Sequence, residues 1–556
     1  MGVKLLSTPN RVFSMRNPFS RALLVAVLIV ILLAGILRSD RLNVRSTVMQ
    51  AATSAKQSIS GQAAMSGFAS KKPHDEVQVE PATPTPYPNG TVVMNCDYDK
   101  DHLQAIQEKY ELGEKFEYFK RYVKIDRQDI HRKPMTNVEQ RFLPKRPKMV
   151  EVTGKDFKDS CPEPLTVPVT NSPSPGSANL TDFMFGVSTT YKRFNDPKTS
   201  PINEWSYWLT DNHGNSNGGK LILLLLEATD EQLFEVWEKL NKIGIDADVF
   251  HSDPSMIMAV RYLTLVPTLY NHPERVNKKW LVICDDDTFF PSPNALADKF
   301  TTEFDSSKPL YIGALSEDVN NIHRHGSQAF GGAGVFLSVP LAKLVSDEYS
   351  SCRSEQKIAE SNSGWGPQGD ILLRKCIYEN SEVRLHSVWD LWQLDLFGDA
   401  SGFYESGIRP LSLHHYRGGG WLLAHPFEYT KLAHLCGEDC TMQRFRTADD
   451  FVISAGYSVA RYPRGVDEID FGQFERTFGA LPEDKGWNLD FMLGPQRRSL
   501  HGTGRKISWE LQESRVNEDG TVGQVYVRKA KDNRWKDQDG KPMSDVDGVI
   551  EMVWIS

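Results

Sequence analysis

Residues 280–290 read Trp-Leu-Val-Ile-Cys-Asp-Asp-Asp-Thr-Phe-Phe, an apolar run that ends in three consecutive aspartates before aromatic residues resume. An unbroken apolar run of this length predicts a strand buried on both faces, with Asp285, Asp286 and Asp287 at its carboxyl end. Open α/β sheets bind ligands at that edge. Adjacent carboxylates repel one another, so we expect them together where water, a cation or a cation-bound phosphate offsets their charge. The stretch therefore predicts metal binding; the alternative is a solvated acidic turn before a helix capped by Ser292.

The sequence around this run alternates between short apolar stretches and longer amphipathic ones. Strands are expected at residues 183–187, 221–226, 246–251 and 280–284, and helices near Trp205 and at residues 231–243 and 255–270. This alternation predicts βαβ units and hence a mainly parallel, doubly wound sheet. The first turn, Ser188-Thr189-Thr190, lacks the glycine-rich dinucleotide fingerprint, which weakens an oxidoreductase interpretation.

Three further motifs follow in the chain. Phe330-Gly331-Gly332-Ala333-Gly334-Val335 is a glycine-dense turn that lets a ligand approach the backbone, or a tight bend without one. Trp365-Gly366-Pro367-Gln368-Gly369-Asp370 precedes a helical run and places Asp370 at a helix start, as a catalytic group or an N-cap. Leu411-Ser412-Leu413-His414-His415-Tyr416 predicts an apolar strand ending in two histidines, which are metal ligands or structural residues.

The amino terminus has the pattern of a membrane anchor. Residues 1–21 contain four basic residues and no acid, and residues 22–37 are apolar apart from Gly35. A helix over residues 22–37 spans about 24 Å, which suits a thin secretory-pathway membrane. The alternative is a cleaved signal peptide, but no clear cleavage site follows. We expect an uncleaved signal anchor with residues 1–21 cytosolic and the remainder of the chain lumenal.

Composition divides the rest of the chain. Residues 38–95 are rich in Ser, Thr, Gln, Ala and Pro, which predicts a disordered stem. Residues 96–178 are expected to form a helical and loop region, with a helix over about 99–123. Residues 179–440 hold the α/β domain. Alternating segments near residues 507–511, 525–527 and 549–555 predict a β-rich accessory region over residues 441–556.

Charge and cysteine content limit the possible classes of protein. The 556 residues carry a net charge of −8 and no basic stripe, so no nucleic-acid partner is expected. The seven cysteines leave at least one unpaired, and Cys284, in the buried strand, is the candidate free thiol. Cys352 with Cys376 and Cys436 with Cys440 are plausible bridges. Glycosylation acceptor patterns begin at Asn89 and Asn179, in keeping with a lumenal chain.

Taken in order, the aspartate triplet, the glycine-dense turn, the Trp-Gly-Pro-Gln-Gly-Asp helix start and the Ser-Leu-His-His strand end resemble the Fringe-like branch of β-1,3-glycosyltransferases. The resemblance extends over about residues 182–426. It implies a GT-A fold, a UDP-sugar donor, a divalent cation, usually Mn²⁺, and inversion at the anomeric carbon. It also implies a type II Golgi membrane enzyme that acts on a glycan or glycoprotein acceptor.

The resemblance also implies roles for individual residues. Asp287 and His414 would ligate the metal, with His415 as an alternative ligand, and Asp370 would be the general base. The nucleotide-sugar would contact Asp285, Asp286, Thr189, Thr190, Gly332 and Gly334. One departure is that the family commonly has two adjacent acids in the Asp370 motif, whereas this chain has Gln368-Gly369-Asp370.

Two other functions compete with a glycosyltransferase. The single acid and the β-rich tail are compatible with a membrane-tethered glycan-binding protein on a degenerate transferase scaffold. A metal-dependent phosphohydrolase would also use a carboxylate cluster and a histidine, but a second acidic strand end for a two-metal site is missing.

Overall fold

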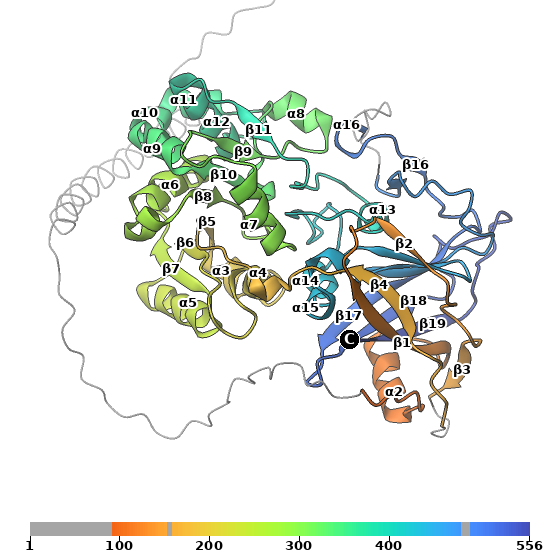
Figure 1. Cartoon of the computed structure of the whole chain (residues 1–556). Coiled ribbons are helices and arrows are strands. Elements are labelled where there is room, and N and C mark those ends of the chain that lie inside the picture. Colours follow the sequence, from red (N-terminus) through yellow and green to blue (C-terminus); the bar gives the residue numbers. More distant parts are fainter. Residues whose placement is uncertain (1–91, 153–157, 480–489) are drawn as a thin grey trace, which may run out of the picture. The chain divides into compact units, whose positions relative to one another are not determined.

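The computed structural model describes residues 92–152, 158–479 and 490–556 (Figure 1). The predicted cytosolic tail, the predicted signal anchor at residues 22–37, most of the predicted stem and the acceptor pattern at Asn89 lie outside these ranges. None of the helices in the described ranges combines the length and the apolar character needed to cross a membrane. The described residues all belong to one compact unit.

A seven-stranded sheet carries the aspartate triplet. Its order is β11-β9-β10-β8-β5-β6-β7, and β5, β6, β7 and β8 pair in parallel, while β10 runs antiparallel to β8 and β9. The bounds are β5 Phe183–Thr190, β6 Lys220–Leu226, β7 Asp246–His251, β8 Trp280–Ile283, β9 Tyr311–Gly313, β10 Val335–Ser338 and β11 Leu385–Ser387. The mainly parallel sheet confirms the prediction from the alternation, and β8 is buried along its whole length.

Helices cover both faces of this sheet, as expected for a doubly wound fold. Their apolar residues pack into two cores, one formed with α6, α9 and α12 and the other with α4, α5 and α7. The helices in this part of the chain are α3 Tyr191–Asn195, α4 Ile202–Leu209, α5 Asp230–Lys242, α6 Met258–Asn271, α7 Pro293–Thr302, α8 Val319–His325, α9 Val339–Asp347, α10 Tyr349–Cys352, α11 Glu355–Glu360 and α12 Gly369–Asn380. The fold is therefore mixed α/β, and the predicted helices near Trp205 and over 231–243 and 255–270 are confirmed.

A ten-stranded sheet joins the two ends of the described chain (Figure 1). Its path is β2-β12-β13-β14-β17-β18-β19-β1-β3, with β4 also paired to β1. The bounds are β1 Lys115–Gln128, β2 Met135–Val138, β3 Lys148–Glu151, β4 Leu165–Thr170, β12 Arg444–Thr447, β13 Phe451–Ser454, β14 Ser458–Arg461, β17 Ile507–Val516, β18 Val522–Arg528 and β19 Asp547–Ile555. The strands predicted in the tail are confirmed.

The prediction of a helix over residues 99–123 is wrong beyond its first part. Helix α2 spans only Lys100–Lys109, and the segment that follows forms β1 instead. The apolar residues of this segment are buried because β1 lies between β19, β3 and β4, with Phe116 and Val123 fully buried. Residues 96–178 therefore contribute four strands to the ten-stranded sheet. The prediction of a helical and loop region over these residues is wrong on this point.

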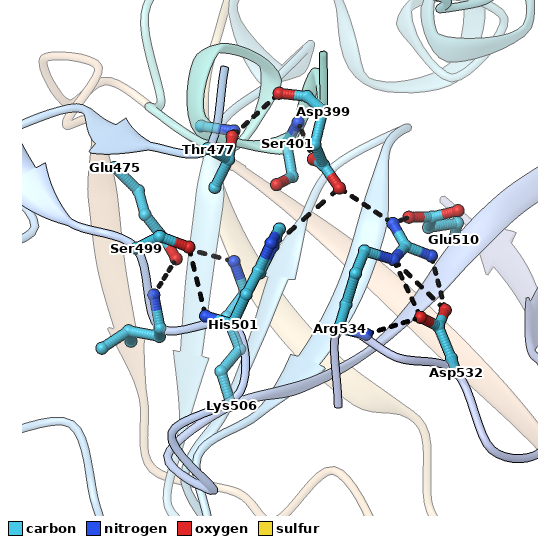
Figure 2. Close-up of polar contacts among 12 residues, drawn as sticks. Asp399, Ser401, Glu475, Thr477, Ser499, His501, Lys506, Glu510, Asp532 and Arg534 are labelled. Atoms are coloured by element: carbon cyan, nitrogen blue, oxygen red, sulfur yellow. Dashed lines mark hydrogen bonds and ion pairs between the residues drawn. The ribbon is translucent and has the colours of Figure 1, made fainter. Parts of the chain in front are cut away.

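Buried ion pairs connect the end of the α/β domain to the tail (Figure 2). The fully buried Lys506 pairs with Glu405 and Glu475, and Glu475 also pairs with Arg497. Figure 2 shows Asp399 reaching both His501 and Arg534, and Arg534 also pairs with Glu510 and Asp532. Positive and negative charges from distant parts of the sequence thus neutralise each other.

The cysteines pair as Cys96–Cys161, Cys352–Cys376 and Cys436–Cys440, and Cys284 is a buried free thiol. Two of these bridges and the free cysteine agree with the sequence expectation. Three bridges are typical of a protein that folds in an oxidising compartment.

Candidate active site

The aspartate triplet lies directly after β8, in a turn that the rest of the domain holds in place. The Asp285 amide donates to Thr288 Oγ1 at 3.0 Å, and this hydroxyl donates to the Gly332 carbonyl at 2.9 Å. The glycine-dense turn, Gly331–Ala333, is thereby fixed beside the aspartates. The helix that follows starts at Pro293, as expected, but its amide groups are capped by Glu438 rather than by the Ser292 side chain.

His414 reaches the triplet through a short backbone bridge. Phe289 and Leu413 exchange two hydrogen bonds, of 2.9 and 2.8 Å, and residues 411–416 otherwise form no strand, which corrects the sequence prediction. His414 Nε2 lies 3.0 Å from Asp287 Oδ1 and 3.4 Å from Asp285 Oδ2. A Cβ at position 332 would come within 2.1 Å of the imidazole, so only glycine leaves room for this ring.

Asp285, Asp287 and His414 form a group whose ligand atoms lie close enough together to hold a metal ion. In the described part of the chain, the ion pairs of both carboxylates are with His414 alone. Two carboxylate oxygens and an imidazole nitrogen fit a divalent cation such as Mn²⁺. The donor atoms present therefore suit the expected metal, although they do not identify the ion.

The charges in this group alter one another's pKa. Burial favours the neutral imidazole, but Asp287 and Asp285 raise the pKa of His414 to about 9. Burial would likewise favour the protonated form of Asp287, yet His414 holds the pKa of Asp287 well below its usual value. Although the Asp285 side chain is 44% exposed, the surrounding protein and the nearby carboxylates raise its pKa to about 6.

Asp286 has a different environment from its two neighbours. It is buried and accepts hydrogen bonds from Arg193 Nε at 2.7 Å and Arg193 Nη2 at 2.6 Å, and also from the Thr189 hydroxyl. A two-pronged guanidinium contact of this kind holds a carboxylate strongly. Asp286 therefore fixes the segment that follows β5, and Thr190 caps α3 by accepting from the Arg193 amide at 3.1 Å.

Asp370 is the second residue of α12, as predicted, but it does not cap the helix. Its carboxylate accepts from the Gly331 amide at 3.3 Å, on the far side of the glycine-dense turn. Burial and the charge of Asp285 raise the pKa of Asp370 to about 7. A carboxylate with this pKa can accept a proton near neutral pH.

His415 has a different carboxylate partner from His414, although the two ring centroids lie 3.9 Å apart. Its φ of 49° is left-handed, so the chain turns and His415 Nδ1 lies 2.9 Å from Asp395 Oδ1. The imidazole stacks on Trp421 with ring centroids 4.0 Å apart, and Trp421 in turn stacks on Phe397. His415 and Asp370 both line a cleft of about 460 Å³.

The predicted residues thus fall into separate places. Asp285, Asp287, His414 and Gly332 lie together, with Asp370 across the glycine turn, while Asp286 and Thr189 contact Arg193. At Gly334, which has a φ of 90°, an added Cβ would meet Phe336 and Phe290. Arg193, Asp395 and Trp421 were not predicted. Only Arg193 had a local signal, as a basic residue that follows the Thr-Thr turn.

Two sequence families match the chain. The Fringe-like family matches residues 238–397, which include the aspartate triplet and Asp370, and a protein family of unknown function, DUF604, matches residues 320–552, which include His414. The chain therefore carries a Fringe-like domain over residues 238–397. The match to DUF604 continues from this Fringe-like domain to β19 in the ten-stranded sheet.

Solved structures with similarity to the chain include several glycosyltransferases. GlyE of Streptococcus pneumoniae is 15% identical, with a TM-score of 0.24, over 39% of this chain and 45% of GlyE, so this chain spans less than half of GlyE. Mouse xyloside xylosyltransferase 1 is 11% identical, with a TM-score of 0.25, over 37% of this chain and 85% of that one. The galactosyltransferase LgtC is 11% identical, with a TM-score of 0.28, over 40% and 77%. No curated protein matches the sequence.

Proposed function

We propose that the chain is a metal-dependent glycosyltransferase of the GT-A fold, which transfers a sugar from a UDP-sugar to a hydroxyl of a glycan or glycoprotein. The observation that carries this proposal is the group of Asp285, Asp287 and His414 at the carboxyl edge of the parallel sheet, with Asp370 beside it. By the family resemblance, the reaction inverts the anomeric carbon and forms a β-1,3 linkage.

Asp285, Asp287 and His414 would hold the divalent cation, for which Mn²⁺ is the first candidate. When bound, such a cation neutralises the charge of the departing diphosphate. Asp286, held by Arg193 and Thr189, positions the turn after β5 next to the triplet. We assign the nucleotide to this β5 side of the group, because the first turn of a parallel sheet lies at its ligand-binding edge.

Asp370 would be the general base. The acceptor oxygen attacks the anomeric carbon of the donor and gives its proton to the Asp370 carboxylate, while the bond from that carbon to the phosphate oxygen breaks. The electron pair of that bond leaves with the diphosphate, so the new glycosidic bond replaces the old one. The position of Asp370 in the cleft, together with its raised pKa, supports an enzyme over a binding protein despite Gln368 in the place of a second acid.

The proposal is tested with the purified full chain, Mn²⁺ and a panel of UDP-sugars, by measuring release of UDP with and without glycan acceptors. We expect Asp287→Ala and Asp370→Asn to lower turnover at least about 100-fold. The matched control is Asp248→Ala, which alters a second group of two carboxylates and a histidine and should keep wild-type turnover. Equal turnover in all four proteins would contradict the assigned site.

We further propose that the enzyme is a type II protein of the Golgi membrane, with the signal anchor at residues 22–37 and a lumenal catalytic domain. The three disulfides support an oxidising compartment. Asn179 is exposed, so its acceptor pattern is accessible to glycosylation. When the chain is expressed in cells, we expect N-glycosidase treatment to increase its electrophoretic mobility. The increase should be smaller for Asn179→Gln than for the wild type. Full digestion of the domain by protease added to intact microsomes would contradict the topology.

A further inference from the structure

The cleft beside Asp370 lies on one side of the metal-binding group. In the sheet, β8 has β5 on one side and β10, followed by β9, on the other. The Arg193 and Thr189 contacts follow β5, whereas the cleft is lined by residues that follow β9, by the loop before α12 and by residues near Trp421. The cleft therefore opens away from the side that we assign to the nucleotide.

One wall of the cleft is a stack of rings that starts at the metal-binding group. His414 and His415 have ring centroids 3.9 Å apart, His415 and Trp421 are parallel within 3° at 4.0 Å, and Trp421 and Phe397 are 4.5 Å apart. Both faces of Trp421 are covered, by His415 and by Phe397. The stack is thus a preformed wall rather than an open binding surface.

A second aromatic feature of the cleft lining is Trp365, a residue that is 71% exposed. The Asn362 side chain accepts hydrogen bonds from the Gly364 and Gly366 amides, at 2.9 and 3.1 Å, and thereby fixes the loop around Trp365. Both glycines have left-handed φ angles, 102° and 92°, which other residues adopt at a cost. The Arg324 guanidinium lies 4.1 Å from the indole centroid and orients the ring. The loop thus holds a large aromatic ring at the cleft, with area that a ligand can cover.

The polar groups of the cleft suit hydroxyls better than charges. Gln328 is 1% exposed, and its carbonyl oxygen has no hydrogen-bond partner, so it is a buried acceptor that a ligand can satisfy. Asn320, Asn321, Gln368 and Gln393 add further side-chain amides. Among the residues that the structure describes, Arg324 is the only lysine or arginine in the lining, and it is stacked on Trp365, while Asp370 and Asp395 would repel an anion.

We propose that this cleft is the acceptor subsite and that it takes a neutral pyranose ring of an existing glycan. The ring stacks on Trp365, a hydroxyl donates to the Gln328 carbonyl, and the reacting hydroxyl faces Asp370. This inference rests on the proposed glycosyltransferase function and narrows the acceptor to a sugar, which excludes a serine or threonine side chain.

Binding is measured with the full chain in the absence of donor and metal, by saturation-transfer NMR. The probes are the methyl glycosides of galactose, glucose, mannose and xylose, the charged methyl glucuronide, and a serine-containing peptide. We expect at least one neutral glycoside to bind, and the glucuronide and the peptide not to bind. Trp365→Ala should weaken that binding about tenfold or more, and Trp365→Phe should retain part of it. The control Trp389→Ala removes another exposed tryptophan, 52% exposed and outside the cleft, and should bind as the wild type does.

Two results would overturn the inference. One is that no neutral glycoside binds, or that the peptide or the glucuronide binds more tightly. The other is that Trp365→Ala binds the glycosides as the wild type does. Failure of the proposed function has a different signature, because UDP release with Mn²⁺ would then be absent while glycoside binding without donor persists.

Discussion

Two groups, each of two carboxylates and a histidine, lie toward opposite ends of the strands of the seven-stranded sheet. Asp285, Asp287 and His414 follow the carboxyl end of β8, whereas Asp248, His272 and Glu274 gather near the amino ends of β6 and β7. At the second group, Lys220 Nζ lies 3.0 Å from Asp248 and 2.9 Å from Glu274, and it also pairs with Asp246 at 2.8 Å. The Lys220 side chain is only 5% exposed, so the protein supplies the cation itself.

The difference shows that two carboxylates and a histidine are not sufficient to indicate a metal site. A fixed ammonium neutralises the Asp248 group. Among the described residues, the ion pairs of Asp285 and Asp287 are with His414 alone, and this histidine must lose its proton before it can ligate a metal. The buried cluster around Lys506 is a stronger example of the first kind, because its two carboxylates and two cations are almost entirely removed from solvent.

Removing the cation from the buried cluster should have the largest effect. Lys506→Met leaves Glu405 without its ion-pair partner and Glu475 with Arg497 alone. We expect a loss of about 4 kcal/mol in the free energy of unfolding, because a buried charge is left uncompensated. Urea unfolding measures this loss, and Lys541→Met, at an exposed lysine, should cost almost nothing. A cost below about 1 kcal/mol for Lys506→Met would show that the cluster is hydrated after all.

The same cluster should make the protein sensitive to acid. Burial opposes the charge, but Lys506 and Arg497 lower the pKa of Glu475 from 4.5 to about 2. This carboxylate therefore stabilises the folded state fully above pH 4.5, and the contribution is lost as the pH falls from 4.5 toward 2. The shift corresponds to about 3 kcal/mol. Stability curves at pH 6 and pH 3 should differ less in Glu475→Gln than in the wild type, and identical pH dependence would refute the assignment.

In the group of Asp285, Asp287 and His414, the imidazole of His414 can be displaced by a substitution that leaves all three of these residues in place. Gly332→Ala places a methyl group within 2.1 Å of the imidazole, so His414 must move away from Asp287. We expect Mn²⁺ affinity, measured by calorimetry, to fall about tenfold or more. Gly113→Ala is the control, since its Cβ would meet no atom closer than 3.6 Å. Unchanged affinity in a folded Gly332→Ala protein would remove His414 from the ligand set.

The smallest effect is expected where the protein's own cation is replaced by a metal. Lys220→Met should cost about 1 kcal/mol, since the surrounding carboxylates are partly exposed, and Mn²⁺ should restore part of it by binding Asp248, His272 and Glu274. Thermal unfolding with and without Mn²⁺, in an Asp287→Ala background, isolates this group. Lys239→Met, which breaks an exposed pair with Glu235, should show no Mn²⁺-dependent recovery. If Mn²⁺ does not restore stability in Lys220→Met either, the ammonium of Lys220 is not the only difference between the two groups.

The α/β domain was predictable from sequence because its signals are local. Apolar runs of strand length alternate with amphipathic helices between residues 183 and 283, and each prediction there needed only the spacing of apolar residues. The segment after α2 was misassigned because Phe116, Phe119 and Val123 are compatible with helical spacing, whereas pairing with β19 decides the structure. That partner lies too far along the chain for any local pattern to reveal it.

Prediction of the site from the sequence is limited in the same way. The triplet, the glycine turn and the start of α12 are local motifs, so Asp285, Asp287 and Asp370 could be named in advance. The separate role of Asp286 depends on Arg193, and the position of His415 depends on a left-handed φ and on Asp395. None of these contacts leaves a pattern of spacing, and neither does the pairing of Lys220 with Asp248 and Glu274 in the second group.

The pairing of β1 with β19 has a consequence for how the protein is made. Tyr118 on β1 donates a hydrogen bond to Glu551 on β19, a residue 433 positions later in the chain. While the ribosome synthesises the chain, β1 emerges early and must wait for the final strand before its edge is paired. Contacts this distant in sequence slow folding and prolong the exposure of unpaired strand edges. Loss of residues from β19 would therefore leave an early segment without this partner, and chaperones are expected to protect β1 during that interval.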